Sequence, residues 1–261
     1  MTYAVSWACF GAAGLLRRTA AANNGAGMLA TALLLIGTFA PSLVALAMTA
    51  WTDGVDAVRA LLDRVFKADV PARWYVFAVG YFLALKLAVA LVHRAAVGAW
   101  PRFGDEPWYV IAAAIVVSTP MQAGEEIGWR GYALPRLGAT MGFGSGSVVL
   151  GIAWGLWHTP LFFIAGLDNF GQSLAVFVAG VTALSVAMAW LYVNTGGSVL
   201  LTMVMHSAVN QTTGIVPSKV PGATNPLTLN GSAVGWLTVV LLWIAAASFI
   251  VRMRRFERCH G

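Results

Sequence analysis

About eight long apolar runs dominate the sequence and constrain its fold more than any other feature. A helix needs about 20 apolar residues to cross about 30 Å of hydrocarbon. Lipid offers no partner for open backbone groups, so runs of this kind must be helical. The sequence therefore predicts an all-α, polytopic membrane helix bundle of about eight transmembrane helices. The runs cover roughly residues 2–16, 28–51, 72–93, 107–124, 146–166, 172–193, 197–214 and 233–251.

The composition supports a single membrane domain over residues 1–261. The chain is 59% hydrophobic and 10% charged, whereas a soluble domain carries about 25% charged residues. The formal net charge of +6 does not indicate nucleic-acid binding, because the charges lie between apolar runs and in the C-terminal tail rather than in a folded basic patch. We therefore expect membrane lipids, and no nucleic acid, as partners.

The distribution of Lys and Arg predicts the orientation. With an even number of spans both termini share one side, and ten of the 16 basic residues then fall on the side of the termini and five on the other. Basic loops face the cytoplasm, so we expect a multi-pass protein of the cell membrane with cytoplasmic termini. Lys86 lies inside a run and is expected to snorkel toward the interface, like His93.

Two polar segments interrupt the apolar pattern. Residues 53–69 place apolar side chains on one helical face, which predicts an amphipathic helix that either lies in the membrane interface or is a solvated connector. Residues 211–232 are rich in Pro, Gly, Thr and Asn, and read as an irregular connection. We expect this loop to be a passive linker rather than a cover for a cavity. The apolar face of the first segment comprises Val55, Val58, Leu62, Val65 and Phe66.

Two adjacent acids, Glu125 and Glu126, lie at the end of an apolar run. An ionisable group within or beside a span is energetically expensive and by default suggests function. Glu126 and Arg130 are four residues apart, so they share a helix face and can form an ion pair. Adjacent carboxylates also resist ionising together. We expect one glutamate to be bound to the arginine while the other handles protons.

Two histidines and an asparagine lie deep in other apolar runs. His158 falls in the run 146–166 and His206 in the run 197–214, where Asn210 follows four residues later on the same helical face. We expect these groups and the glutamates to converge on one cavity. Because the fourth run should end near the membrane surface while the histidines lie deeper, this convergence requires its helix to tilt, kink or start late, or water to reach inward.

Each feature alone also has a structural explanation. A buried histidine often serves only as a hydrogen-bonding residue, and Glu126–Arg130 alone would more often be a structural ion pair. Their joint occurrence is harder to explain in that way, because several desolvation costs would accumulate at once. A relay for proton-coupled transport and a non-catalytic membrane scaffold remain alternatives to an enzyme.

Three motifs resemble the CAAX prenyl endopeptidase and bacteriocin-processing (CPBP, or Abi) family of intramembrane proteases. Glu125-Glu126-x-x-x-Arg130 matches its first motif, Trp154-x-x-x-His158 is similar to its second, and His206-x-x-x-Asn210 to its last. Tryptophan stands where the second motif usually has phenylalanine. The resemblance covers roughly residues 106–215, which we take as the core helices.

The resemblance implies an endopeptidase that hydrolyses peptide bonds in the bilayer, acting on a peptide or protein substrate, with or without a lipid attached. An activated water is the expected nucleophile, with Glu125 as general base and His158 positioning the water. His206 and Asn210 would stabilise the developing oxyanion, and Arg130 would hold Glu126. A zinc site of Glu125, His158 and His206 is the alternative. We favour the metal-free scheme, because asparagine is a natural oxyanion donor and a poor zinc ligand.

Overall fold

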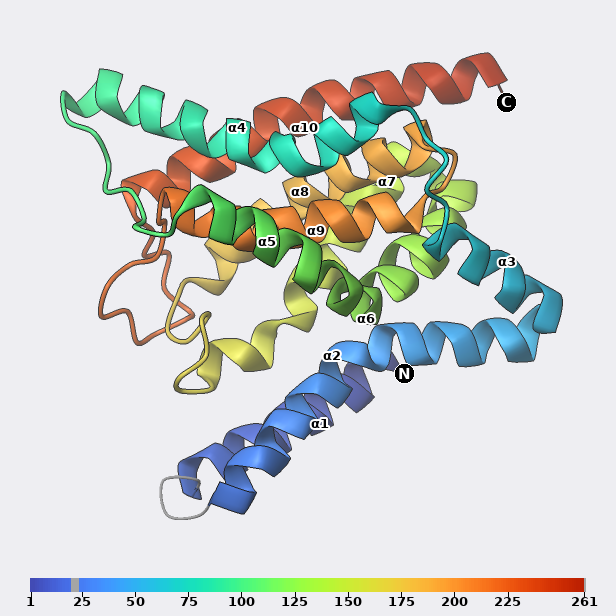
Figure 1. Cartoon of the computed structure of the whole chain (residues 1–261), viewed down its shortest axis with the longest axis horizontal. Coiled ribbons are helices and arrows are strands. Elements are labelled where there is room, and N and C mark those ends of the chain that lie inside the picture. The colour runs from blue at the N-terminus through green and yellow to red at the C-terminus, as the bar shows by residue number, and fades with distance from the viewer. Residues whose placement is uncertain (20–23, 261) are drawn as a thin grey trace.

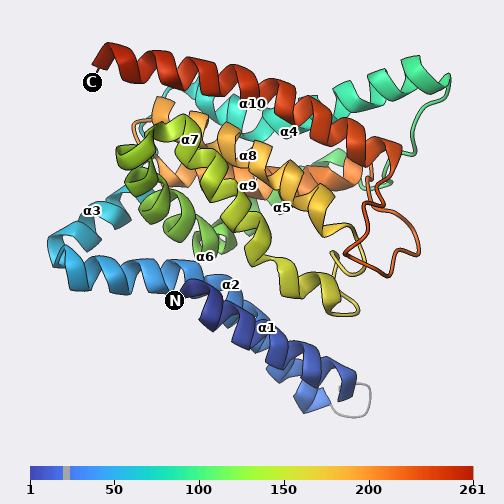
Figure 2. The same cartoon turned by 180° about the vertical axis from the view of Figure 1, so that it is seen from behind.

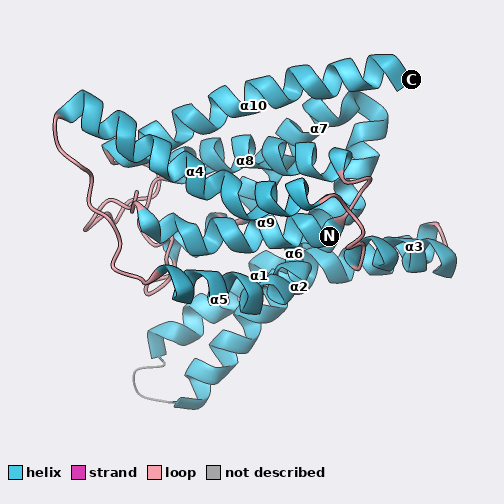
Figure 3. Ribbon diagram, turned by 45° about the horizontal axis from the view of Figure 1, so that its top comes forward, coloured by secondary structure: helices cyan, strands magenta, loops and turns pink. Residues whose placement is uncertain are grey.

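The computed structural model describes residues 1–19 and 24–260, and every regular element in them is helical (Figures 1 and 3). The prediction of an all-α membrane helix bundle is confirmed. The α-helices are α1 (Thr2–Thr19), α2 (Asn24–Thr52), α3 (Val55–Val65), α4 (Ala72–Val97), α5 (Trp108–Ser118), α6 (Ala123–Glu126), α7 (Leu134–Trp157), α8 (Leu174–Asn194), α9 (Val199–Thr212) and α10 (Ala233–His260).

Five stretches of the described chain are long and apolar enough to cross a membrane, which makes the protein multi-pass. One of them, Trp108–Phe163, contains both the fourth and the fifth predicted runs. The first and seventh runs form α1 and α9, which are outside this set, and α9 has only 14 residues. At 1.5 Å per residue, α9 is too short to cross about 30 Å alone. The other four stretches are Gly25–Thr52, Ala72–Val97, Leu174–Asn194 and Ala233–Arg255.

Helix α9 runs through the middle of the bundle, where it packs against α4, α5 and α8 (Figure 1). Helices α7 and α10 pack against α8, and α10 also contacts α4 (Figure 2). Helices α1 and α2 form a hairpin that projects from one side of the bundle (Figures 1 and 2). Because α9 is enclosed, its polar side chains face other helices rather than lipid. The cytoplasmic placement of the termini stays a prediction.

The helical path between α5 and α7 is irregular. This irregularity explains how the glutamates of the fourth run can reach the depth of the histidines. The chain passes from α5 through a 3₁₀ turn (Thr119–Gln122) into α6 and then through a π-helical segment (Ile127–Ala133). Turns of these types change the helical register and often mark functional sites. Glu125 and Glu126 therefore lie inside the bundle instead of at the end of a straight span.

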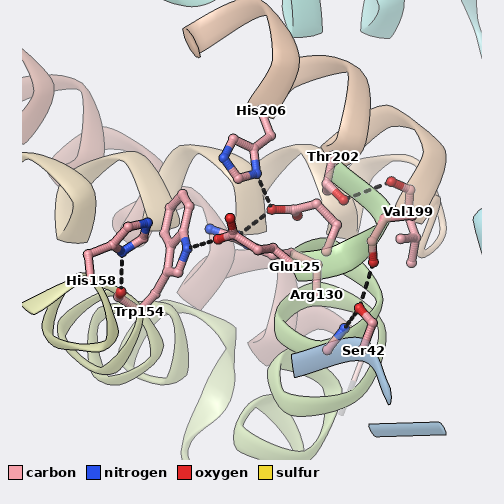
Figure 4. A network of polar contacts seen from close by, with 11 residues as sticks. Ser42, Glu125, Arg130, Trp154, His158, Val199, Thr202 and His206 are labelled. Atoms are coloured by element: carbon pink, nitrogen blue, oxygen red, sulfur yellow. Dashed lines mark hydrogen bonds and ion pairs between the residues drawn. The ribbon is translucent and has the colours of Figure 1, made fainter. Parts of the chain in front are cut away.

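Helix α2 fixes this irregular segment in place. The Ser42 hydroxyl donates to the Ala123 carbonyl (2.6 Å) and accepts from the Gly128 amide (3.2 Å) (Figure 4). A Cβ on Gly128 would lie 2.6 Å from the Pro41 carbonyl carbon. Only glycine permits so close an approach of two backbones. Ser42 thus satisfies backbone groups that the break in regular helix would leave without partners.

Helix α7 differs from the predicted fifth run, 146–166, at both ends. It begins at Leu134, bends where Gly142 has a left-handed φ of 77°, and ends at Trp157 before a 3₁₀ turn. The backbone of Gly142 is non-helical, so it separates two helical parts, and the predicted run covers only the second of them. A Cβ on Gly151 would lie 2.6 Å from the Thr182 Cα. The close contact between α7 and α8 therefore depends on this glycine.

Helix α3 confirms the predicted helix within residues 53–69. Leu61 and Val65 are buried, whereas the Arg59–Asp56 ion pair is exposed. The helix packs against α2, α9 and the π-helical segment. Its position at a membrane interface stays a prediction.

Candidate active site

Glu126 and Arg130 form a fully buried ion pair beneath the cavity of the bundle. Both side chains are 0% exposed, and Arg130 Nη1 donates to Glu126 Oε1 at 2.6 Å. The predicted pair is therefore present. The Arg130 Cζ atom also lies 4.0 Å from the centroid of the Trp154 ring. In a water-poor setting such a cation–π contact adds to the ion pair.

His206 extends this pair toward α9. Its Nδ1 lies 2.9 Å from Glu126 Oε1, the same oxygen that Arg130 binds (Figure 4). A carboxylate beside a guanidinium accepts hydrogen bonds, so Nδ1 is the donor and Nε2 is left on the opposite side of the ring. A hydrogen-bond partner that holds one nitrogen of an imidazole ring also fixes the direction in which the other nitrogen points.

Glu125 has different partners from its neighbour, as expected for two carboxylates with separate tasks. Its Oε2 accepts a hydrogen bond from the Trp154 indole at 2.7 Å (Figure 4). Glu125 lines the cavity, and its residue is 8% exposed. One carboxylate is therefore tied up beneath the site while the other reaches the space where a substrate would lie.

His158 stands at the end of α7, where helix gives way to the 3₁₀ turn. Its Nδ1 lies 2.8 Å from the Trp154 carbonyl oxygen. A carbonyl only accepts, so Nδ1 carries the proton and Nε2 carries the lone pair. The ring packs against Trp157 and Phe177, with centroid distances of 4.7 and 5.1 Å. These rings hold the imidazole in one orientation.

Glu125, His158, His206 and Asn210 all line one cavity of about 350 Å³. The predicted convergence on one cavity holds for these four residues, whereas Glu126, which was expected there as well, is fully buried outside the cavity lining. Asn210 is exposed to the cavity, and its amide has no protein hydrogen-bond partner among the described residues. The cavity combines this polar end with apolar side chains of α4, α8, α9 and α10. The catalytic roles of the six predicted residues stay predictions.

Two contributions to the site were missed from the sequence. Trp154 entered the prediction only as part of a motif and with no role of its own, yet its indole N–H donates to Glu125, a bond that phenylalanine cannot make. The tryptophan at a motif position that usually holds phenylalanine was the one signal in the sequence that could have indicated this bond. Ser42 lies outside every motif, and its role depends on a tertiary contact that no local pattern indicates.

The loop 211–232 is part of the cavity, so its interpretation as a passive linker was wrong. Thr213, Ser218, Lys219 and Val220 line the cavity. Two hydrogen bonds join the side chain of Gln172 to the backbone of Val220, at 2.8 and 3.1 Å. The loop is held to the segment before α8 and forms the rim of the cavity.

Two other expectations bear on charge. Lys86 was expected to snorkel, but it is 1% exposed and points into the bundle.

The alternative zinc ligands were Glu125, His158 and His206. Among residues 1–19 and 24–260, no three His, Cys, Asp or Glu side chains are grouped so that they could hold a metal ion. The arrangement of these donors therefore does not fit a preformed zinc site.

The fold and the site define a class: a helical membrane protein with a buried carboxylate–imidazole network beneath a cavity. Residues 104–212 match the family described as type II CAAX prenyl endopeptidase Rce1-like. CAAX prenyl protease 2 of Methanococcus maripaludis is 30% identical over 92 residues, which are 33% of this chain and 34% of that protein. The chain thus spans about a third of the curated relative's length. These matches confirm the predicted resemblance to the CPBP family, and the matched segment contains all six predicted site residues.

Proposed function

We propose that the chain is a CAAX-type intramembrane endopeptidase that cleaves a membrane-anchored peptide with a water activated by Glu125. The observation that carries the proposal is the cavity that Glu125, His158, His206 and Asn210 share. The similarity to CAAX prenyl endopeptidases supports the same activity. Neither similarity points to a transporter or to a non-catalytic scaffold. A substrate of this class ends in a prenylated cysteine followed by three residues.

In the proposed reaction, a water bound between Glu125 and His158 attacks the scissile carbonyl carbon. The water gives one proton to Glu125 and a hydrogen bond to Nε2 of His158, which carries the lone pair because Nδ1 donates to Trp154. The indole of Trp154 holds one oxygen of Glu125. The other oxygen is left to face the water.

The negative charge that develops on the carbonyl oxygen must be stabilised by hydrogen-bond donors. We assign this role to Nε2 of His206 in its imidazolium form and to the amide of Asn210. Glu126 supports the imidazolium because it accepts from Nδ1, and Arg130 holds Glu126 in place. When the intermediate collapses, Glu125 returns its proton to the leaving amine, so a peptide and a water become a carboxylic acid and an amine.

The test uses the purified full chain in liposomes and a synthetic peptide that ends in S-farnesyl cysteine, two aliphatic residues and methionine. We expect wild type to release the last three residues and Glu125→Gln to lower kcat by about 10²–10⁴-fold, the usual contribution of a general base. Glu106→Gln is the matched control, because Glu106 is an exposed glutamate outside the cavity. Absence of cleavage by wild type, or full activity of Glu125→Gln, would refute the proposal.

The same assay addresses the metal. We propose a metal-free reaction, since the free amide of Asn210 lies at the cavity and the donor set does not form a preformed metal cluster. Cleavage should persist after incubation with a zinc chelator and dialysis. Loss of activity that added zinc restores would favour the zinc scheme instead.

A further inference from the structure

Lys86 is a buried cation that the proposed reaction does not use. It lies in the middle of α4 and is 1% exposed. In the described part of the chain it forms no salt bridge, and its one hydrogen bond is a long contact of 3.4 Å from Nζ to Thr238 Oγ1. The Thr238 hydroxyl already donates to the Val234 carbonyl. An ammonium with so weak a partner is costly inside a membrane protein, and such residues usually serve a function.

The position of Lys86 relates it to the cavity. Thr238 and Phe82 both line the cavity, and Lys86 Nζ lies 5.8 Å from the centroid of the Phe82 ring. The ammonium therefore stands directly behind two residues of the cavity wall. Apart from these, α8 and α10 contribute apolar side chains to the cavity, among them Val181, Leu184 and Leu242.

The other lysine at the cavity is already neutralised. Lys219 lies at the exposed rim, where its Nζ is 2.7 Å from Asp168 Oδ1. No such acid accompanies Lys86 in the described residues. An anion that entered the cavity would thus meet a lysine with a counter-ion at the rim and, among the described residues, a lysine without one behind Phe82 and Thr238.

We propose that Lys86 binds the C-terminal carboxylate of the peptide that is cut. This inference rests on the proposed function, because a substrate that loses its last three residues carries a free carboxylate about 10 Å beyond the scissile bond when extended. The carboxylate replaces Thr238 as partner of the ammonium, and the apolar wall receives the two aliphatic side chains. A charge-assisted bond in a water-poor cavity also explains how the enzyme selects chain ends.

Two peptides that differ only at the chain end test the proposal: the farnesylated peptide with a free carboxylate and the same peptide with a carboxamide. We expect wild type to favour the carboxylate in kcat/KM by roughly tenfold to hundredfold, the range for a hydrogen bond to a charged group. Lys86→Met should remove this preference by slowing only the carboxylate peptide, and Lys86→Arg should restore part of it. Lys67→Met, at a partly buried lysine outside the cavity whose Nζ donates to the Gly196 carbonyl, should retain the preference.

A binding experiment makes the inference independent of turnover. The tripeptide product, with either a free carboxylate or an amide, is titrated against wild type and Lys86→Met while the unfolding temperature in detergent is followed. We expect the carboxylate form to stabilise only the protein that has Lys86. The role of Lys86 is overturned if the carboxylate tripeptide stabilises wild type and Lys86→Met equally. It is also overturned if the preference for the carboxylate over the amide survives Lys86→Met and disappears in Lys219→Met. Absence of cleavage together with Lys86-dependent binding overturns the proposed function and leaves the carboxylate site standing.

Discussion

Replacement of Arg130 by methionine is the most direct test of the network beneath the cavity. The change keeps an unbranched side chain but removes the guanidinium that binds Glu126 at 2.6 Å and lies over the Trp154 ring. Both members of the pair are 0% exposed, so Glu126 would be left as a buried charge with His206 as its one remaining partner. Loss of one partner from a buried pair lowers the free energy of unfolding by about 3–5 kcal/mol.

The measurement is reversible unfolding of the purified protein in detergent, followed by circular dichroism. Arg59→Met is the matched control, because Arg59 forms an ion pair with Asp56 on the surface, where the side chains are 74% and 94% exposed. Exposed pairs of this kind contribute little. We expect the control variant to unfold like wild type and Arg130→Met to unfold much earlier.

A double variant separates charge from packing. Glu126→Gln combined with Arg130→Met removes both charges, so no uncompensated ion is buried, and the double variant should be more stable than Arg130→Met alone. The double variant should nevertheless fail to cleave peptide, because His206 has lost the negative charge that supports its imidazolium form in the proposed reaction. The reasoning is refuted if Arg130→Met costs no more than Arg59→Met, or if the second substitution adds to the loss.

Two further predictions concern the contact between α2 and the irregular segment. Gly128→Ala should lower the free energy of unfolding by about 1–3 kcal/mol, because the new Cβ would overlap the Pro41 backbone. Gly80→Ala in α4 has open space around it and should be neutral or slightly stabilising in the same unfolding assay. Ser42→Ala leaves the Gly128 amide and the Ala123 carbonyl without their partner. It should cost about 1–3 kcal/mol and lower kcat in the farnesyl-peptide assay, whereas unchanged kcat would argue against a positioning role.

The sequence predicted the polar groups of the site because lipid makes each of them expensive. Glu125, His158 and His206 stand out within apolar runs, and regular spacing alone paired Glu126 with Arg130. The chain of contacts from Arg130 through Glu126 to His206 was not predictable in this way. It depends on the π-helical segment and on the depth of α9, which follow from packing between helices distant in the chain.

The failures have a common physical origin. The limits of the runs were set by hydropathy. The backbone of Gly142 is non-helical, so the part of α7 after it begins close to the predicted run, and the helical part before it was not predicted. The loop 211–232 was judged by composition, which indicates irregular backbone but not what that backbone touches. Lys86 was expected to reach the interface, but its neighbours Phe82 and Thr238 enclose it.

Two adjacent glutamates can perform different work because successive side chains on a helix point about 100° apart and meet different neighbours. Here α6 turns Glu126 toward Arg130 and His206, while Glu125 turns toward Trp154 and the cavity. The indole donates a hydrogen bond but carries no charge, so it orients the Glu125 carboxylate without forming an ion pair with it. Arg130 also lies over that indole. The side chain that neutralises Glu126 therefore also helps to hold Trp154, and Trp154 orients Glu125.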